Sequence, residues 1–118
     1  MKTKKPIGIQ LYTVRDHLET DYFGTLEKIA EIGYNTVEFA GYYGQSAENI
    51  RKKLDELKLT CISSHQNYEV LVNDLDSVIE SHKILGCKYI AVPWAGDDER
   101  PGGKNFEEAV KNYTAIGE

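Results

Sequence analysis

Residues 33–40 read Gly-Tyr-Asn-Thr-Val-Glu-Phe-Ala and contain the pattern on which the fold assignment depends. Gly33 suits the left-handed backbone position just past a helix end, and the apolar run after it predicts a short strand. Side chains alternate between the two faces of a strand, so Val37 and Phe39 share one face and Glu38 lies on the other. The sheet is therefore expected to be apolar on one face and polar on the other.

The same order of strand, polar loop, amphipathic helix and turn occurs four times along the chain. The predicted strands are Ile7–Tyr12, Thr36–Ala40, Thr60–His65 and Lys88–Trp94. Strands that alternate with helices at this spacing are typical of a parallel sheet, because each crossover returns to the same end of the sheet. The chain is predicted to be an α/β protein with a parallel (βα)4 arrangement.

Capping signals mark the ends of the predicted helices. A stripe of apolar residues leads into Gly33, and Ser46 is a candidate N-cap for the second helix. The third helix is expected to close at Gly86. The fourth is predicted to open at Asn105, with Glu108 three residues later in a capping-box arrangement.

The second face of the sheet decides between a doubly wound fold and a barrel. The first loop, residues 11–15, contains no glycine, which argues against a dinucleotide fingerprint. The face predicted to meet the helices carries Ile7, Ile9, Leu11, Val37, Phe39, Ile62 and Ser64; the opposite face carries Gly8, Gln10, Tyr12, Thr36, Glu38, Ala40, Cys61, Ser63 and His65. A second layer of helices needs an apolar face, whereas a barrel lumen with a polar mouth accepts these residues. Gln10, Glu38 and His65 are expected to converge at the carboxyl ends of their strands.

Composition and charge argue against several classes of function. The chain has 118 residues, of which 41% are hydrophobic and 28% charged, and its formal net charge is −5. Nucleic acids and anionic membranes attract clustered Lys and Arg, so neither is expected as a partner. Cys61 and Cys87 lie far apart in the sequence and form no CxxC pair, so neither a disulfide scaffold nor a zinc ribbon is expected. The cytoplasm is the expected location.

Four segments together resemble a known family. They are residues 9–15, 33–39, 63–65 and 92–94, and their order and spacing are similar to the opening half of sugar phosphate isomerases/epimerases of the xylose isomerase-like TIM barrel superfamily. The resemblance implies half of an eight-stranded (β/α) barrel. We accordingly expect residues 1–118 to form a single domain, an N-terminal half-barrel of four βα units that is cut short in the fourth helix.

The resemblance also implies an activity in carbohydrate metabolism. A family member would move a proton or a hydride on a small sugar, sugar phosphate or keto-sugar, beside a carbonyl polarised by a divalent metal (Mn, Mg, Co or Zn). The relatives hold that metal on their last four strands, so no metal ligand and no bound cofactor is expected in this chain. This chain alone is expected to be inactive and to supply the substrate-binding half of the parent enzyme.

Two alternatives stay open at this point, and a third, an endonuclease, is disfavoured by the acidic charge and by the residues after the fourth strand. An inosose dehydratase-like lyase uses the same scaffold. An abasic-site endonuclease shares the fold but needs a second histidine after the fourth strand, where this chain has Pro93-Trp94-Ala95. The non-enzymatic alternative is a catalytically inactive half-barrel that self-associates, as a homodimer or larger assembly, through its open strand edges.

Five residues are candidates for the site. Glu38 and His65 are the candidate catalytic residues, and Gln10, Tyr12 and Trp94 join them as candidate substrate contacts. A carboxylate in a buried strand is costly unless it is paired or functional, so a structural ion pair is the alternative role for Glu38. His65 can equally be a hydrogen-bonded lumen histidine, Gln10 a tie for the lumen backbone, and Trp94 a packing residue rather than a wall for the sugar ring.

Overall fold

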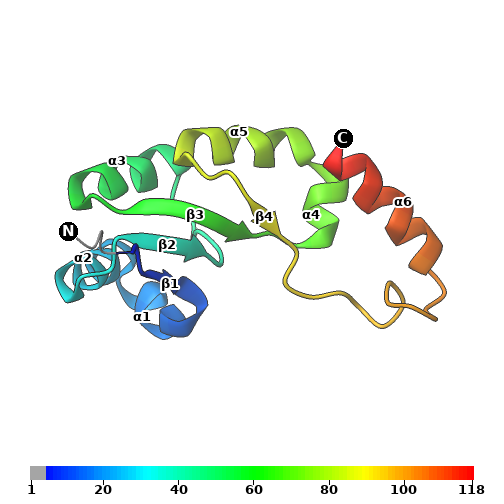
Figure 1. The fold of residues 1–118 in the computed structure, drawn as a ribbon, viewed down its shortest axis with the longest axis horizontal. Coiled ribbons are helices and arrows are strands. Elements are labelled where there is room, and N and C mark those ends of the chain that lie inside the picture. Colours follow the sequence, from blue (N-terminus) through cyan, green and yellow to red (C-terminus); the bar gives the residue numbers. More distant parts are fainter. Residues whose placement is uncertain (1–4) are drawn as a thin grey trace.

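A computed structural model describes residues 5–118 as a four-stranded parallel sheet in the order β1-β2-β3-β4 (Figure 1). The strands are β1 (Gly8–Gln10), β2 (Thr36–Phe39), β3 (Thr60–His65) and β4 (Ile90–Ala91). Each strand pairs with the next one in the chain, so the order in space follows the order in the sequence. This is the arrangement of consecutive strands in a (β/α) barrel, and it confirms the predicted (βα)4 fold.

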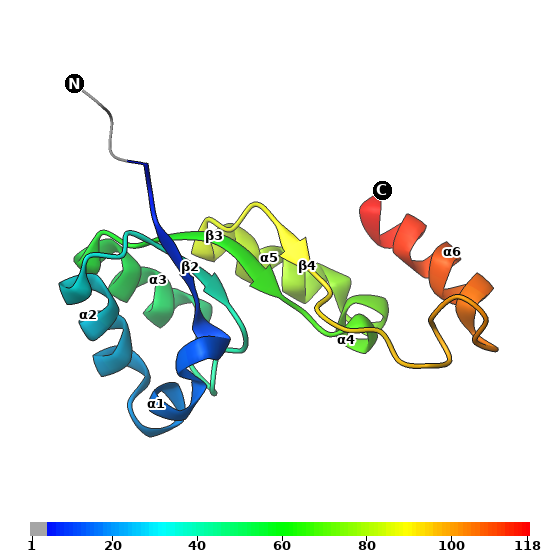
Figure 2. The same ribbon diagram turned by 60° about the horizontal axis from the view of Figure 1, so that its bottom comes forward.

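The helical elements are a 3-10 turn η1 (Leu11–Val14), α1 (Arg15–Thr20), α2 (Tyr22–Ile32), α3 (Ala47–Leu57), α4 (Tyr68–Asn73), α5 (Leu75–Leu85) and α6 (Phe106–Gly117). Helix α3 packs between α2 and α5, and the three follow one another along one face of the sheet (Figure 2). Helix α6 lies beyond α4, at the far end from α2. Within residues 5–118, no helix has the length and apolar character needed to cross a membrane.

The core lies between the sheet and these helices. Val37 and Phe39 are fully buried there, together with Ile50 from α3, as the alternation in β2 predicts. The helix ends also follow the sequence signals in three places. Ser46 Oγ accepts a hydrogen bond from the backbone N–H of Asn49 at 3.2 Å, and Gly33 and Gly86 take left-handed conformations with φ of 112° and 69°.

Other expectations about the helices and strands are wrong. Asn105 makes no side-chain cap, so the predicted capping box with Glu108 does not form. The short helices α1 and α4 add a second helix to the first and third units, where the repeated pattern predicted one helix each. The first strand ends at Gln10 because the chain turns into η1, and the fourth is only two residues long. Tyr12 and Trp94 therefore lie in segments that follow their strands.

A β-bulge in the pairing of β2 with β3 changes which residues face the helices. Val37 pairs with Cys61 but Glu38 pairs with Ser63, so the register shifts by one residue between the two pairs. Cys61 is consequently buried on the helix side, and Ile62 is 44% exposed on the other side, the reverse of the prediction for both. Beyond the bulge the alternation agrees with the prediction again, with a fully buried Ser64 and a partly exposed His65.

The sheet face without helices is called the open face here and carries Gly8, Gln10, Thr36, Glu38, Ile62 and His65. A Cβ atom on Gly8 would lie 2.5 Å from Thr36 Oγ1 and 3.4 Å from Ile62 Cδ1, which places these three residues on the same face. Ile7 was expected to meet the helices, but it precedes β1 and is 60% exposed.

Candidate functional site

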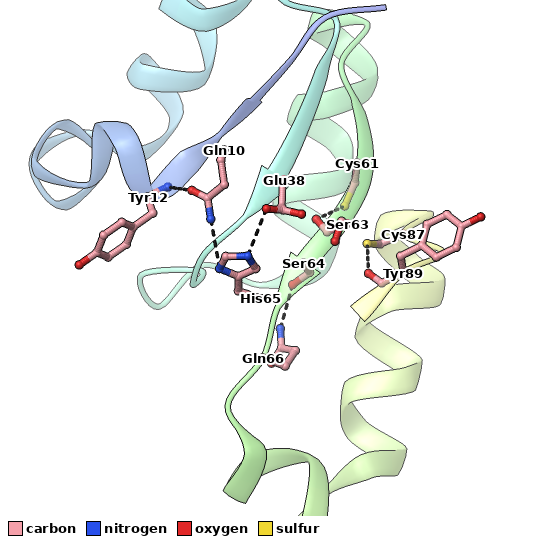
Figure 3. Close-up of polar contacts among 10 residues, drawn as sticks. All are labelled: Gln10, Tyr12, Glu38, Cys61, Ser63, Ser64, His65, Gln66, Cys87 and Tyr89. Atoms are coloured by element: carbon pink, nitrogen blue, oxygen red, sulfur yellow. Dashed lines mark hydrogen bonds and ion pairs between the residues drawn. The ribbon is translucent and has the colours of Figure 1, made fainter. Parts of the chain in front are cut away.

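Gln10, Glu38 and His65 meet at the carboxyl ends of β1, β2 and β3, as the sequence predicts (Figure 3). His65 lies between the other two side chains. Its Nδ1 atom is 3.1 Å from Gln10 Nε2, and its Nε2 atom is 3.1 Å from Glu38 Oε1. The imidazole is thus held at both nitrogens by side chains from two neighbouring strands, which leaves little freedom for the ring to rotate.

The hydrogen bonds also determine where the proton of His65 lies. The backbone N–H of Tyr12 donates to Gln10 Oε1, so the Gln10 amide must present its NH2 group to His65. His65 Nδ1 can only accept from that donor, and the ring proton therefore resides on Nε2. Nε2–H donates to the Glu38 carboxylate. The backbone N–H of Tyr12, in η1, thereby sets the tautomer of His65 on β3.

The Glu38–His65 pair is partly accessible to solvent. The side chains of His65 and Glu38 are 27% and 26% exposed, so neither carries the desolvation penalty of a fully buried charge. A pair in this position contributes only about 1 kcal/mol or less to folding. Its two groups remain available to hydrogen-bond a molecule that binds over the open face.

A cavity of about 740 Å³ opens over this network at the carboxyl end of the sheet. It is lined by Gln10, Tyr12, Thr13, Ala40, Gly41, Tyr42, His65, Gln66, Asn67, Val70, Pro93 and Trp94. Four of the five predicted site residues line it directly, and the fifth, Glu38, is hydrogen-bonded to His65 behind it. The volume suits a small ligand such as a monosaccharide.

Two exposed aromatic side chains stand at the edges of the cavity. Tyr12 is 58% exposed and Trp94 is 68% exposed. The guanidinium of Arg15 lies 4.3 Å from the centre of the Tyr12 ring and also donates to the Tyr12 carbonyl at 3.0 Å. Arg100 lies 5.5 Å from the Trp94 ring centre and donates to the carbonyl of Ala95 at 2.8 Å. Each aromatic ring is steadied by a cation–π contact with an arginine that is anchored to nearby backbone.

A second polar cluster was not predicted from the sequence. Tyr42 Oη lies 3.1 Å from Ser64 Oγ, and the Gln66 amide donates to Tyr42 Oη at 3.1 Å and to Ser64 Oγ at 2.9 Å. Burial raises the pKa of Tyr42 above its ordinary value, so its hydroxyl stays protonated near neutral pH. Tyr42 and Gln66 line the same cavity. Their position in the segments that follow the carboxyl ends of β2 and β3 was the signal that could have identified them.

The described residues do not form a metal site of their own. Among residues 5–118, no three His, Cys, Asp or Glu side chains come close enough together to hold an ion. Both nitrogens of His65 are already engaged, one by an amide N–H and the other by a carboxylate. In the loop before α6, Asp97 pairs with Arg100 and Asp98 with Lys104, at 2.9 and 3.0 Å, and these carboxylates are largely exposed.

Comparison with known structures identifies the architecture. A sugar phosphate isomerase/epimerase from Parabacteroides distasonis matches with a TM-score of 0.66 and 25% sequence identity, over 97% of this chain and 52% of the other. The chain has the fold of half a sugar phosphate isomerase/epimerase. A second such structure from the same organism matches with a TM-score of 0.57 and 20% identity, over 98% of this chain and 46% of the other. The chain therefore spans about half the length of these proteins.

The resemblance predicted from the sequence is confirmed at the level of the N-terminal half-barrel. No protein-family model and no curated protein matches the sequence. The binding and catalytic roles of the five candidate residues remain predictions. The structure shows that Gln10, Tyr12, His65 and Trp94 line one cavity and that Glu38 contacts His65 behind it.

Proposed function

We propose that this chain supplies the substrate-binding half of a sugar or sugar phosphate isomerase/epimerase. The observation that carries the proposal is the Gln10–His65–Glu38 network beneath a cavity of about 740 Å³ at the carboxyl ends of parallel strands. Active sites of (β/α) barrels lie at this end. The likeness to two sugar phosphate isomerase/epimerase structures supports the reaction class.

The side chains around the cavity suit a polyhydroxylated ligand. The Glu38 carboxylate accepts from His65 and has further lone pairs for sugar hydroxyls. Gln66 and Tyr42 offer an amide and a phenol on the neighbouring wall. The rings of Tyr12 and Trp94 provide apolar surfaces for the C–H face of a sugar. In the proposed reaction, His65 holds its proton on Nε2 beside Glu38, where the two form a candidate acid–base pair.

The parent reaction proposed here uses a divalent cation, which would polarise the substrate carbonyl. The described residues of this chain do not form its site, because no three ligating side chains come together and Glu38 and His65 already bind each other. The roles proposed for this chain are thus binding and proton positioning by its own side chains. A lyase of the inosose dehydratase type would use the same groups, and product analysis of the parent reaction separates the two. The two free cysteines are compatible with the cytoplasmic location proposed for the enzyme.

A self-associating half-barrel is a second candidate, and a specific observation favours it. The sheet has two unpaired edges within residues 5–118, at β1 and β4. Ile62 on the open face is 44% exposed, and Tyr89 and Ile90 beside the β4 edge are 70% and 38% exposed. Unpaired edges and exposed apolar side chains favour pairing with another chain.

Calorimetric titration of the 118-residue chain with a panel of aldoses, ketoses and their phosphates tests the proposal. We expect at least one member to bind, and Glu38→Gln and His65→Gln each to weaken that binding about tenfold or more, because each removes a group beneath the cavity. Glu80→Gln is the matched control, since Glu80 is 67% exposed and pairs with Lys83 on α5. Absence of binding across the panel, or equal affinities in all four proteins, would contradict the proposal.

A further inference from the structure

Cys61 and Cys87 are brought together by the fold although they are distant in the sequence. Strand β3 pairs with β4 through Ser64↔Ile90 and His65↔Ala91, and the same register carried back three residues sets Cys61 opposite Cys87. Neighbouring strands lie about 4.8 Å apart, within the range of about 4.4–6.8 Å that a disulfide spans between Cα atoms. The two thiols turn toward the same space between the strands (Figure 3).

Both thiols are free, buried and part of the same hydrophobic core, with exposures of 4% and 9%. Each also donates to a carbonyl two residues further along, Cys61 to Ser63 at 3.6 Å and Cys87 to Tyr89 at 3.3 Å. A thiol is a weak hydrogen-bond donor, so little hydrogen-bond energy is lost when the protons leave. The sulfur atoms are held in place by packing on two adjacent segments.

The thiols differ in reactivity because they interact with each other. The neighbouring Cys61 thiol lowers the pKa of Cys87 to about 7, while Cys87 and burial raise the pKa of Cys61. Cys61 and both chain neighbours of Cys87, Gly86 and Lys88, line a cavity of about 570 Å³, so solvent-filled space lies beside the pair.

We propose that Cys61 and Cys87 are a redox modification site, in which a peroxide converts the two thiols into an intrachain disulfide joining β3 to the segment that enters β4. The Cys87 thiolate attacks one peroxide oxygen, the O–O bond breaks, and Cys87 becomes a sulfenic acid while the other oxygen leaves as water or an alcohol. The Cys61 sulfur then attacks the Cys87 sulfur, its proton is lost, and the sulfenic oxygen leaves as water. Two thiols are oxidised and one peroxide is reduced.

This site is independent of the proposed sugar-binding function, and it is tested on the chain itself. The purified protein is treated with hydrogen peroxide in native buffer, alkylated after denaturation, and digested with trypsin without reduction. We expect loss of both alkylatable thiols and a disulfide linking the peptides 59–83 and 84–88 within one chain, restored to two alkylated peptides by a reductant. The oxidised protein should also unfold at a higher denaturant concentration than the reduced protein.

Cys87→Ser and Cys61→Ser are the control variants, and neither should form the cross-linked peptide. If a variant fails to fold, the wild-type peptide map alone still decides the question. Two thiols that remain alkylatable after peroxide treatment, cysteines that gain oxygen without cross-linking, or a disulfide found only between chains would each overturn the proposal.

Discussion

The two faces of the sheet differ in what their residues do, although they alternate along the same strands. In β2, Phe39 is fully buried against the helices, whereas its neighbour Glu38 is 26% exposed and bound to His65 on the open face. The helix side consists mostly of packed apolar groups, and the carboxyl end of the open side carries a hydrogen-bonded polar network. Stability and binding can therefore be changed separately by substitutions one residue apart.

The largest expected effect is on the helix side. Phe39→Ala removes a fully buried aromatic ring and leaves a cavity, so we expect it to lower the free energy of unfolding by about 3–5 kcal/mol. Ile62→Ala, on the open face at 44% exposure, should lower it by less than about 1 kcal/mol. Urea unfolding followed by circular dichroism measures both. Similar losses for the two variants would mean that the open face is not open in solution.

The second prediction concerns assembly through the unpaired strand edges. The 118-residue chain should be at least a dimer, because the β1 and β4 edges are unpaired and Tyr89 and Ile90 beside the β4 edge are exposed. Light scattering measures the molar mass. Tyr89→Lys should shift the chain toward monomer, and Ile32→Lys, equally exposed at the end of α2, should leave the molar mass unchanged. A monodisperse wild-type monomer at micromolar concentration is the contrary result.

A smaller effect separates two tyrosines. Within residues 5–118, the buried Tyr22 hydroxyl has no hydrogen-bond partner, whereas the Tyr42 hydroxyl is bonded to Ser64 and Gln66. Removing an unpaired buried hydroxyl relieves its desolvation cost, so Tyr22→Phe should raise the free energy of unfolding by about 1 kcal/mol. Tyr42→Phe should lower it by about 1 kcal/mol because two hydrogen bonds are lost. Changes of the same sign in both variants would contradict this assignment.

The same two tyrosines set a pH dependence. Burial raises the pKa of Tyr22 and of Tyr42 above the ordinary value of 10.0, so each stays protonated in the folded chain after it ionises in the unfolded chain. The contribution of these two groups to the free energy of unfolding is fully present below pH 10. It is lost as the pH rises above 10, by up to about 1.4 kcal/mol per pH unit for each group. Tyr22→Phe should make this alkaline loss shallower in urea unfolding at pH 9 to 11.

The assignment of residues to the helix side or the open face of the sheet could be predicted in part from the sequence. Alternation in β2 placed Val37 and Phe39 correctly, since both faces of that strand are marked by side-chain polarity. The predicted sheet faces of Cys61 and Ile62 are the reverse of the observed ones, because a β-bulge depends on the pairing with another strand and leaves no local signal. His65 was assigned correctly because the bulge precedes it.

The remaining parts of the site depend on contacts between distant segments. The proton position on His65 follows from Tyr12 N–H, which approaches Gln10 only because the chain turns into η1 there. Tyr42 and Gln66 join the cavity wall through Ser64, and the Cys61–Cys87 pair arises from the β3–β4 register. No periodicity in the sequence contains this information.

The most direct test of the open-face site is nitrogen-15 NMR of the His65 imidazole, recorded before and after addition of a sugar that binds in the calorimetric panel. The network predicts protonated Nε2 and unprotonated Nδ1 in the free chain, and a shift of both resonances when the cavity above them is occupied. Gln10→Met removes the amide donor and should allow both tautomers. A free chain with the proton on Nδ1, or His65 resonances unmoved by a bound sugar, would contradict the assignment of this network as the binding site.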